Sequence, residues 1–472
     1  MNLNELTISK AHAGLKAGDF SAEELTRACL DRIKKRNKDL NAFIEVDEEG
    51  ALQAARNVEI KTPLSGIPMG IKDIYCVKGW ECTAASKILK GFKPPYDATA
   101  ISKLRDSGTV LLGRTNMDEF ACGASTEHSC FGPTKNPHDL ARVPGGSSGG
   151  SAASVADDMC LGAMGTDTGG SVRQPASLCG CVGLKVTYGR TSRFGVMAMA
   201  SSWDTISPFA KTTEDAALIL QEIAGKDPKD STTPDKSVPN YTEALTGDVR
   251  GLKIGVPKEY FGEGVEEETA SKVMEAVRAL EKAGAILKEV SLPNMKYAIA
   301  LYYIAMPAEL SANLARYDGI RFGRKPSDTG EDLMDYYRNA RTEGFGEEIK
   351  RRIMIGTYVL SAGYYDAYYK KAQQVRTLVI RDFERVFEEV DVLCGPVSPY
   401  PAFKLGENLD DPLKMYMADL LTIPASAAGI PGLSVPCGKS SGGLPIGLQI
   451  MGRQFDEGTV LQVGDAWEKI RG

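Results

Sequence analysis

Two serines framed by glycines stand close together in the first half of the chain. Ser147 lies in the segment PGGSSGGS (144–151), and Ser171 ends the segment GTDTGGS (165–171). Glycines permit turns that other residues avoid, and they let backbone N–H groups approach a reacting oxygen. A serine becomes a nucleophile when a neighbouring base takes its proton. The pattern therefore predicts a nucleophilic serine with an oxyanion hole, and it leaves open which residue is the base.

Histidine is the usual base in such sites, yet no histidine follows either serine. The segment GGSSG (145–149) fits the G-x-S-x-G nucleophile elbow of α/β-hydrolases, but that fold needs a histidine after the serine. The S-x-x-K pattern of penicillin-binding proteins fails as well, because Gly150 and Gln174 stand where its lysine should be. The chain has three histidines, all of them before Ser147: His12, His128 and His138.

Lys72 remains as the candidate base. It lies in the apolar run GIPMGIKD (66–73). Burial disfavours the charged form of a lysine and can bring its pKa near 7. A single lysine is more often an ordinary surface residue, so the interpretation depends on its combination with the two glycine-framed serines.

The three segments together resemble the amidase signature family, in which the lysine motif, PGGSSGGS and GTDTGGSxRxPA occur in this order. Members of that family use a Ser–cis-Ser–Lys triad. The resemblance implies that Ser171 is the nucleophile, that Ser147 is the bridging serine with a cis peptide bond, and that Lys72 is the base. It also implies an oxyanion hole made by the backbone N–H groups of Thr168, Gly169 and Gly170.

Within this family, the whole chain resembles the glutaminase A subunits of tRNA-dependent aspartyl/glutamyl amidotransferases, in the segments 344–353, 363–378 and 415–424. Such subunits hydrolyse glutamine and supply ammonia for the amidation of Glu-tRNA(Gln) or Asp-tRNA(Asn). The resemblance implies that Arg352 binds the α-carboxylate of glutamine, which a planar guanidinium matches well. It implies that Asp419 binds the α-ammonium and that Tyr302 lines the pocket.

The same resemblance implies a heterotrimer with B and C subunits. The B subunit would bind the charged tRNA, use ATP and Mg²⁺, and receive ammonia through an internal channel, while a small C subunit would help to hold the other two together. The chain itself is expected to carry no cofactor and no metal. It contains no Walker A motif, no G-x-G-x-x-G motif and no C-x-x-C pair, the patterns typical of phosphate, dinucleotide and metal or redox sites.

Composition is that of a soluble globular protein, with 43% hydrophobic and 25% charged residues. A net charge of −6 argues against a chain that grips nucleic acid by itself. No apolar run reaches membrane-spanning length, and the first residues do not form a signal peptide. The ten cysteines are expected to be small buried side chains in a reducing compartment. These features predict a cytoplasmic protein.

The order of apolar runs predicts an α/β fold. We expect a strand at 109–112, a helix at 148–158 and a strand at 160–164 that leads into Ser171, which places this serine between a strand and a helix. The alternation indicates a largely parallel arrangement, and the family resemblance implies a central twisted mixed sheet covered by helices. One domain is expected over residues 1–472. Its parts are a helical segment (1–60), a catalytic region (61–225) and a helical section near the substrate pocket (295–390).

Two other interpretations remain open from the sequence. A free-standing amidase acting on another small amide would share the triad and lack the paired roles of Arg352 and Asp419. A non-enzymatic chain that only scaffolds a complex would need no triad, and the presence of Lys72, Ser147 and Ser171 argues against it.

Overall fold

The core of the molecule is one mixed sheet of eleven strands in the order β1-β3-β2-β4-β6-β5-β10-β11-β9-β7-β8. The computed structural model describes residues 2–472. The strands are β1 (Phe43–Val46), β2 (Pro68–Lys72), β3 (Val110–Thr115), β4 (Gly162–Asp167), β5 (Val182–Lys185), β6 (Thr205–Ala210), β7 (Lys253–Pro257), β8 (Ile286–Val290), β9 (Val392–Pro396), β10 (Gly432–Lys439) and β11 (Pro445–Gly452).

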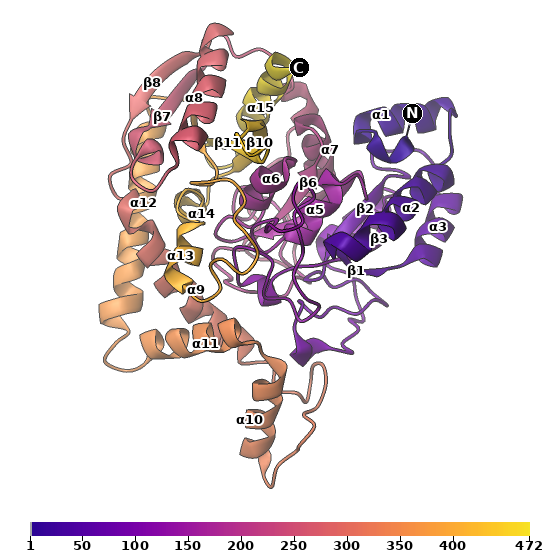
Figure 1. The fold of residues 1–472 in the computed structure, drawn as a ribbon, viewed down its shortest axis with the longest axis vertical. Helices are drawn as coiled ribbons and strands as arrows, with labels where there is room; N and C mark the ends of the chain where they lie inside the picture. Colours follow the sequence, from indigo (N-terminus) through magenta and orange to yellow (C-terminus); the bar gives the residue numbers. More distant parts are fainter. Residues whose placement is uncertain (1) are drawn as a thin grey trace.

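Helices cover this sheet and extend beyond it (Figure 1). They are α1 (Ile8–Ala17), α2 (Ala22–Leu40), α3 (Glu48–Asn57), α4 (Thr99–Asp106), α5 (Gly149–Ala156), α6 (Arg173–Cys179), α7 (Thr213–Ile223), α8 (Glu267–Lys282), α9 (Ala298–Leu314), α10 (Leu333–Gly344), α11 (Glu347–Leu360), α12 (Lys371–Phe387), α13 (Pro412–Met417), α14 (Ile423–Ala428) and α15 (Glu457–Arg471).

The expected mixed sheet is confirmed, whereas the expectation of a largely parallel arrangement is wrong. Four strand pairings are parallel and six are antiparallel. Strand β2 runs parallel to β3 and β4, as the helical crossovers between them require. The antiparallel part arises because β10 and β11 form a hairpin and β6 lies between β4 and β5.

The first sixty residues are mainly helical, as predicted, but they also contain the edge strand β1. Helix α2 begins with a capping box in which Ser21 and Glu24 exchange hydrogen bonds. It ends at Asn41, which adopts a left-handed conformation with φ of 52°. The chain then pairs antiparallel with β3 over Phe43–Val46. Four residues are too few to show a strand period, which is why the sequence does not reveal β1.

The glycine-rich region folds as the sequence predicts. Strand β3 follows α4, helix α5 lies within 148–158, and β4 leads into a turn followed by α6. Strand β4 pairs with β2 on one side and β6 on the other, so it runs through the interior of the sheet. Ser171 stands in the turn between β4 and α6, close to the end of β2.

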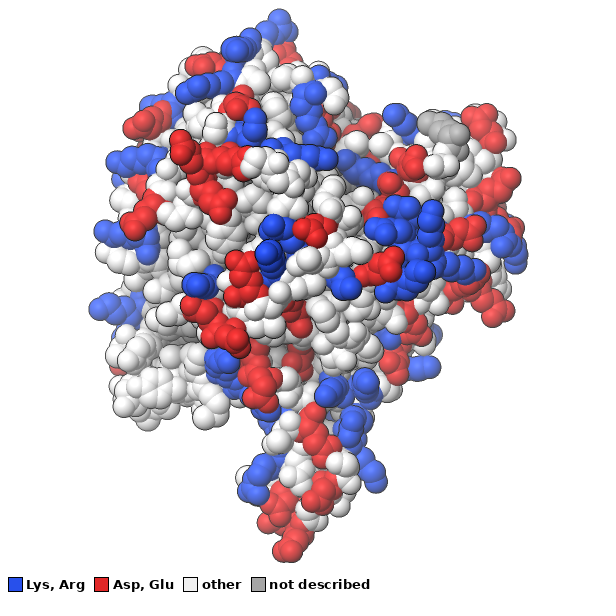
Figure 2. All heavy atoms as spheres, viewed as in Figure 1, with Lys and Arg blue, Asp and Glu red and all other residues white. Residues whose placement is uncertain are grey.

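The helical section α9–α12 packs beside the strands of the second half, and α10 projects away from the rest of the molecule (Figure 1). On the face shown in Figure 2, acidic and basic side chains are interspersed. Among residues 2–472, we find no helix that combines the length and the apolar character needed to cross a membrane.

Candidate active site

Lys72 ends β2 and is completely buried. Its Nζ atom lies within hydrogen-bonding distance of three hydroxyl oxygens, at 2.8 Å from Ser147 Oγ, 2.7 Å from Ser148 Oγ and 2.8 Å from Thr166 Oγ1. The surrounding partners are thus neutral hydroxyls. Such partners serve a neutral amine as well as an ammonium, because the hydroxyls can donate as well as accept.

Burial lowers the pKa of Lys72 to about 7, and the nearby carboxylates of Asp118, Asp204 and Asp167 raise it only in part. A large fraction of the side chain is therefore a neutral amine near pH 7. This is the state that the sequence interpretation requires of a base.

The hydroxyl groups of Ser148 and Ser147 beside Lys72 differ in the acceptor to which each can donate its hydrogen. Ser148 donates to the carbonyl oxygen of Thr166 at 3.2 Å, so its oxygen accepts from the amine. Within residues 2–472, the Ser147 hydroxyl has Lys72 as its one hydrogen-bond partner. The hydrogen of Ser147 is consequently available to the lone pair of a neutral Lys72, which is the direction of transfer that a base needs.

The nucleophile candidate Ser171 is buried, with 7% of its surface exposed. Its Oγ accepts a hydrogen bond from the backbone N–H of Ser147 at 3.1 Å. Residues 2–472 contain no cis peptide bond, so the expectation of a cis peptide at Ser147 is wrong for this structure. The trans form is favoured by about 3–4 kcal/mol at a non-proline residue. The structure thus brings the two serines together, but it is the backbone N–H of Ser147, and not its hydroxyl, that forms the hydrogen bond with Ser171 Oγ.

The turn before α6 offers free backbone donors. The Asp167 carboxylate accepts from the N–H groups of Val172 and Arg173 at 3.2 and 3.3 Å, so the first donors of α6 are already used. In the part of the chain that the structure describes, no group accepts from the N–H groups of residues 169–171. These three donors are open to an oxyanion. The side chain of Thr168 donates to Asp204 at 2.7 Å, and the role of Thr168 in the oxyanion hole stays a prediction.

Arg352 is buried on α11 beside two aromatic rings, Tyr303 and Tyr416, which stack on each other with centres 3.8 Å apart. Its guanidinium lies 4.5 Å from the ring centre of Tyr303 and 4.3 Å from that of Tyr416, so it packs against the side of this stacked pair. Its Nε donates to Glu348 at 2.7 Å. Its Nη1 is buried and has no hydrogen-bond partner among the described residues. Half of the guanidinium fork is therefore free for a carboxylate.

Asp419 and Tyr302 connect this guanidinium with the nucleophile turn. Tyr303 donates to Asp419 at 2.9 Å, and burial raises the pKa of Asp419 to about 7. The ring of Tyr302 lies 5.0 Å from that of Tyr303. The hydroxyl end of Tyr302 lies so close to the turn that a Cβ on Gly169 would stand 2.8 Å from Tyr302 Cζ. Tyr302 thus contacts the turn that carries Ser171, and Tyr303 connects Tyr302 with both Asp419 and Arg352.

The structure also reveals contributors that the sequence analysis did not single out. Ser148 and Thr166 lie inside the two serine motifs, and their hydroxyl groups are a signal that could have suggested contact with Lys72. Tyr303 and Tyr416 come from other elements than Arg352, and their local sequence carries no such signal. Glu348 lies four residues before Arg352 on α11, a helical spacing that the sequence does display.

A chain with this α/β sheet and this cluster of lysine and serines matches the family model described as Amidase over residues 24–461, and the protein belongs to that family. It is 54% identical to the protein named as the A subunit of glutamyl-tRNA(Gln) amidotransferase in Desulfatibacillum aliphaticivorans, over 99% of this chain and 98% of that protein.

Solved structures agree with this assignment. The A subunit of glutamyl-tRNA(Gln) amidotransferase from Thermotoga maritima aligns with a TM-score of 0.85 at 43% identity, covering 99% of this chain and 95% of that one. The peptide amidase of Stenotrophomonas maltophilia aligns with a TM-score of 0.82 at 30% identity, over 98% and 96% of the two chains.

Proposed function

We propose that this chain is the glutaminase subunit of a tRNA-dependent amidotransferase. The observation that carries the proposal is the buried guanidinium of Arg352 with a free Nη1, which contacts the same residue, Tyr303, as the buried carboxylate of Asp419. A cation and an anion at such a site match the carboxylate and the ammonium of a free amino acid. The full-length similarity to proteins named as A subunits of an amidotransferase supports glutamine as that amino acid.

Acylation begins with attack of Ser171 Oγ on the side-chain carbonyl carbon of glutamine. The Ser147 hydroxyl contacts Lys72 and not Ser171 in this structure, so this step requires it to come within reach of Ser171 Oγ. The proton of Ser171 then passes to the Ser147 hydroxyl, and the proton of Ser147 passes to the neutral Lys72. The N–H groups of residues 169–171 stabilise the negative oxygen, and one such donor is typically worth about 3–4 kcal/mol. When the carbon–nitrogen bond breaks, the proton returns along the same route to the leaving nitrogen, which departs as ammonia.

Deacylation uses the same groups. Water attacks the glutamyl ester on Ser171, and the serine relay to Lys72 takes a proton from it. The ester bond breaks, Ser171 regains its hydrogen, and glutamate leaves. The free ammonia is the useful product, because it is the nucleophile for the amidation of an acylated tRNA.

The partners follow from this chemistry. The amidation needs a charged tRNA and an activated carboxyl group, and we assign the binding of tRNA, ATP and Mg²⁺ to a B subunit. A small C subunit is the third member of the heterotrimer, which works in the cytoplasm. Glutamine hydrolysis is then expected to depend on the state of the B subunit, because the two sites are coupled through binding.

The test compares glutamate release by the isolated chain with release by the reconstituted complex, each with and without charged tRNA and ATP. The proposal predicts slow hydrolysis by the isolated chain and faster hydrolysis in the complete mixture. A free-standing amidase is the rival. It would be supported if the isolated chain hydrolysed simple aryl or aliphatic amides with a higher kcat/KM than glutamine and the additions changed nothing.

The first prediction from the site concerns pH. The pKa of Lys72 is about 7, so the neutral base is lost as pH falls below this value. The pKa of Asp419 is also about 7, and its carboxylate must be ionised to bind an ammonium. We expect kcat/KM for glutamine to fall about tenfold or more per pH unit on the acid side and to level off above about pH 8.

The control for this profile is Asp419→Asn, which cannot ionise. It should lower activity throughout and make the acid limb less steep, because one of the two titrating groups is gone. A wild-type kcat/KM that stays flat between about pH 5.5 and 8 would contradict the assignment of Lys72 as the base.

The second prediction concerns substrate recognition by Arg352. Arg352→Lys removes the planar fork and its packing against Tyr303 and Tyr416. We expect KM for glutamine to rise about tenfold to a hundredfold, the range of one lost charged hydrogen bond, with a smaller change in kcat. The matched control is Arg351→Lys. Arg351 also contacts Glu348 from the same helix, but 45% of its side chain is exposed, and its replacement should leave KM within about twofold. Equal effects of the two substitutions would argue against the role of Arg352.

A further inference from the structure

Thr422, which directly precedes α14, lies against the glycine turn that carries Ser171. It is completely buried. Gly170 has a φ of +152°, and a Cβ added there would stand 2.2 Å from Thr422 Oγ1. On the adjacent residue, a Cβ at Gly169 would meet the ring of Tyr302. Gly170 therefore packs against Thr422 and Gly169 packs against Tyr302, and neither position has space for a side chain.

The hydroxyl of Thr422 joins the turn to the segment that carries Asp419. Its Oγ1 donates to the carbonyl oxygen of Gly169 at 2.6 Å. The backbone N–H of Thr422 donates to the carbonyl oxygen of Asp419 at 3.1 Å. A single residue thus connects the main chain of the oxyanion turn with the main chain of the residue assigned to the substrate ammonium.

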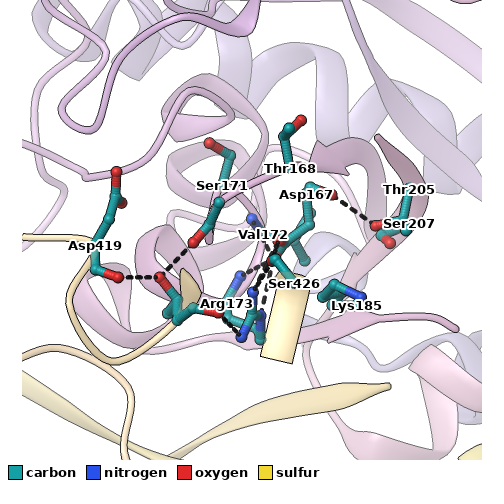
Figure 3. Close-up of polar contacts among 12 residues, drawn as sticks. Asp167, Thr168, Ser171, Val172, Arg173, Lys185, Thr205, Ser207, Asp419 and Ser426 are labelled. Atoms are coloured by element: carbon teal, nitrogen blue, oxygen red, sulfur yellow. Dashed lines mark hydrogen bonds and ion pairs between the residues drawn. The ribbon is translucent and has the colours of Figure 1, made fainter. Parts of the chain in front are cut away.

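A buried ion pair holds this connection in place. Arg173 pairs with Asp167 at 2.9 Å, and both side chains are fully buried. Arg173 also donates to the carbonyl oxygen of Thr422 at 2.9 Å and to Ser426 Oγ at 2.8 Å. Figure 3 shows Arg173 with its hydrogen bonds to Asp167 and Ser426. The start of α6 and the segment 419–426 therefore form one polar unit around Thr422.

The hydrogen bond from Thr422 to the carbonyl of Gly169 also determines the direction of the next N–H group, that of Gly170. The carbonyl of Gly169 and the N–H of Gly170 belong to the same planar peptide and point in opposite directions. A hydrogen bond from Thr422 that fixes the carbonyl of Gly169 also fixes the direction of the Gly170 N–H. That N–H is one of the donors of the turn with no acceptor in the described part of the chain. A fixed direction is what an oxyanion donor requires.

We propose that Thr422 is a positioning residue, which orients the Gly170 N–H toward the oxyanion. Through its main-chain contact with Asp419, Thr422 also couples this donor to the binding of the substrate's α-ammonium by Asp419. The inference rests on the proposed glutaminase function. Tyr303, which donates to Asp419, and Tyr302, which contacts Gly169, provide a second connection between Asp419 and the same turn. When the α-ammonium of an amino acid binds the Asp419 carboxylate, the oxyanion hole becomes better ordered. An amide substrate without an α-ammonium does not have this effect.

The experiment uses the complete complex with three forms of the chain, wild type, Thr422→Ala and Thr422→Ser, and two substrates. Glutamine is compared with glutaramate, which has the same carboxylate and amide but no α-amino group. Removal of the hydroxyl should lower kcat for glutamine about tenfold to a hundredfold, the scale of a small misplacement of catalytic groups, with KM within about threefold. Serine keeps the hydroxyl and should recover most of the lost kcat.

The coupling has its own readout, which a purely structural role would not change. In the wild type, the ratio of kcat for glutamine to kcat for glutaramate should be large, and in Thr422→Ala it should fall about tenfold. An unchanged ratio, or a kcat that does not distinguish alanine from serine, would overturn the proposal.

Folding is checked by the thermal midpoint Tm. If Thr422→Ala does not fold, Thr422→Cys carries the same prediction, because a thiol is a much weaker donor of similar size. Failure of the wild-type complex to hydrolyse glutamine would instead refute the proposed function, so the two failures are distinguishable.

Discussion

Replacement of Ser171 by alanine is expected to abolish glutamine hydrolysis, with kcat lowered by roughly three to six orders of magnitude. The reason is that Ser171 is the serine in the turn whose free N–H groups, at residues 169–171, receive the oxyanion, while the hydroxyl of Thr168 in the same turn is engaged with Asp204. The measurement is glutamate release by the complex at saturating glutamine. The variant should keep the wild-type Tm, since its side chain makes one weak contact, with the N–H of Ser147 at 3.1 Å.

Two controls make this result specific. Ser441→Ala changes an exposed serine in the loop between β10 and β11 and should leave kcat within about twofold. In the complex, Ser171→Ala should still support amidation of the acylated tRNA when ammonium chloride replaces glutamine, because the second site is separate. More than a few per cent of residual glutaminase activity in a folded variant would exclude Ser171 as the nucleophile.

Lys72→Arg is expected to be nearly as inactive as Lys72→Ala, with losses of roughly three orders of magnitude or more in kcat. Arginine keeps a positive charge but cannot lose its proton near neutral pH. If Lys72 were only a structural cation among the hydroxyls of Ser147, Ser148 and Thr166, arginine would preserve part of the activity.

Size is a second difference between lysine and arginine at a fully buried site. Lys72→Met therefore serves as the matched variant, because it has a similar length, carries no charge and cannot act as a base. Both variants are compared by Tm and by glutamate release. Activity in a folded Lys72→Arg clearly above that of Lys72→Met would rule out the role of base.

The local part of the site could be predicted from the sequence. The motif GTDTGGS places Ser171 between a strand and a helix because glycines follow an apolar run and precede a helical one, and the structure has β4 and α6 there. The depressed pKa of Lys72 follows from its burial, which the apolar run GIPMGIKD (66–73) predicts. Short-range patterns were sufficient for these features.

The remaining features depend on contacts between distant segments. The ring of Tyr416 against Arg352 and the hydroxyl of Thr422 on Gly169 join parts of the chain that no local pattern relates. The direction of the strands also depends on the path of the chain, since β6 enters between β4 and β5. The trans peptide at Ser147 differs from what the family resemblance implied, and sequence patterns do not specify the isomer of a non-proline bond.

The claim that Ser171 releases ammonia for use at a partner's site is tested most directly with glutamine that is isotopically labelled at the amide nitrogen. The reconstituted complex, with charged tRNA and ATP, is given this glutamine together with excess unlabelled ammonium in the buffer. We expect the new amide on the tRNA-bound amino acid to carry the label in the wild type and to carry unlabelled nitrogen in Ser171→Ala. Unlabelled product from the wild-type complex, or labelled product from Ser171→Ala, would contradict the account.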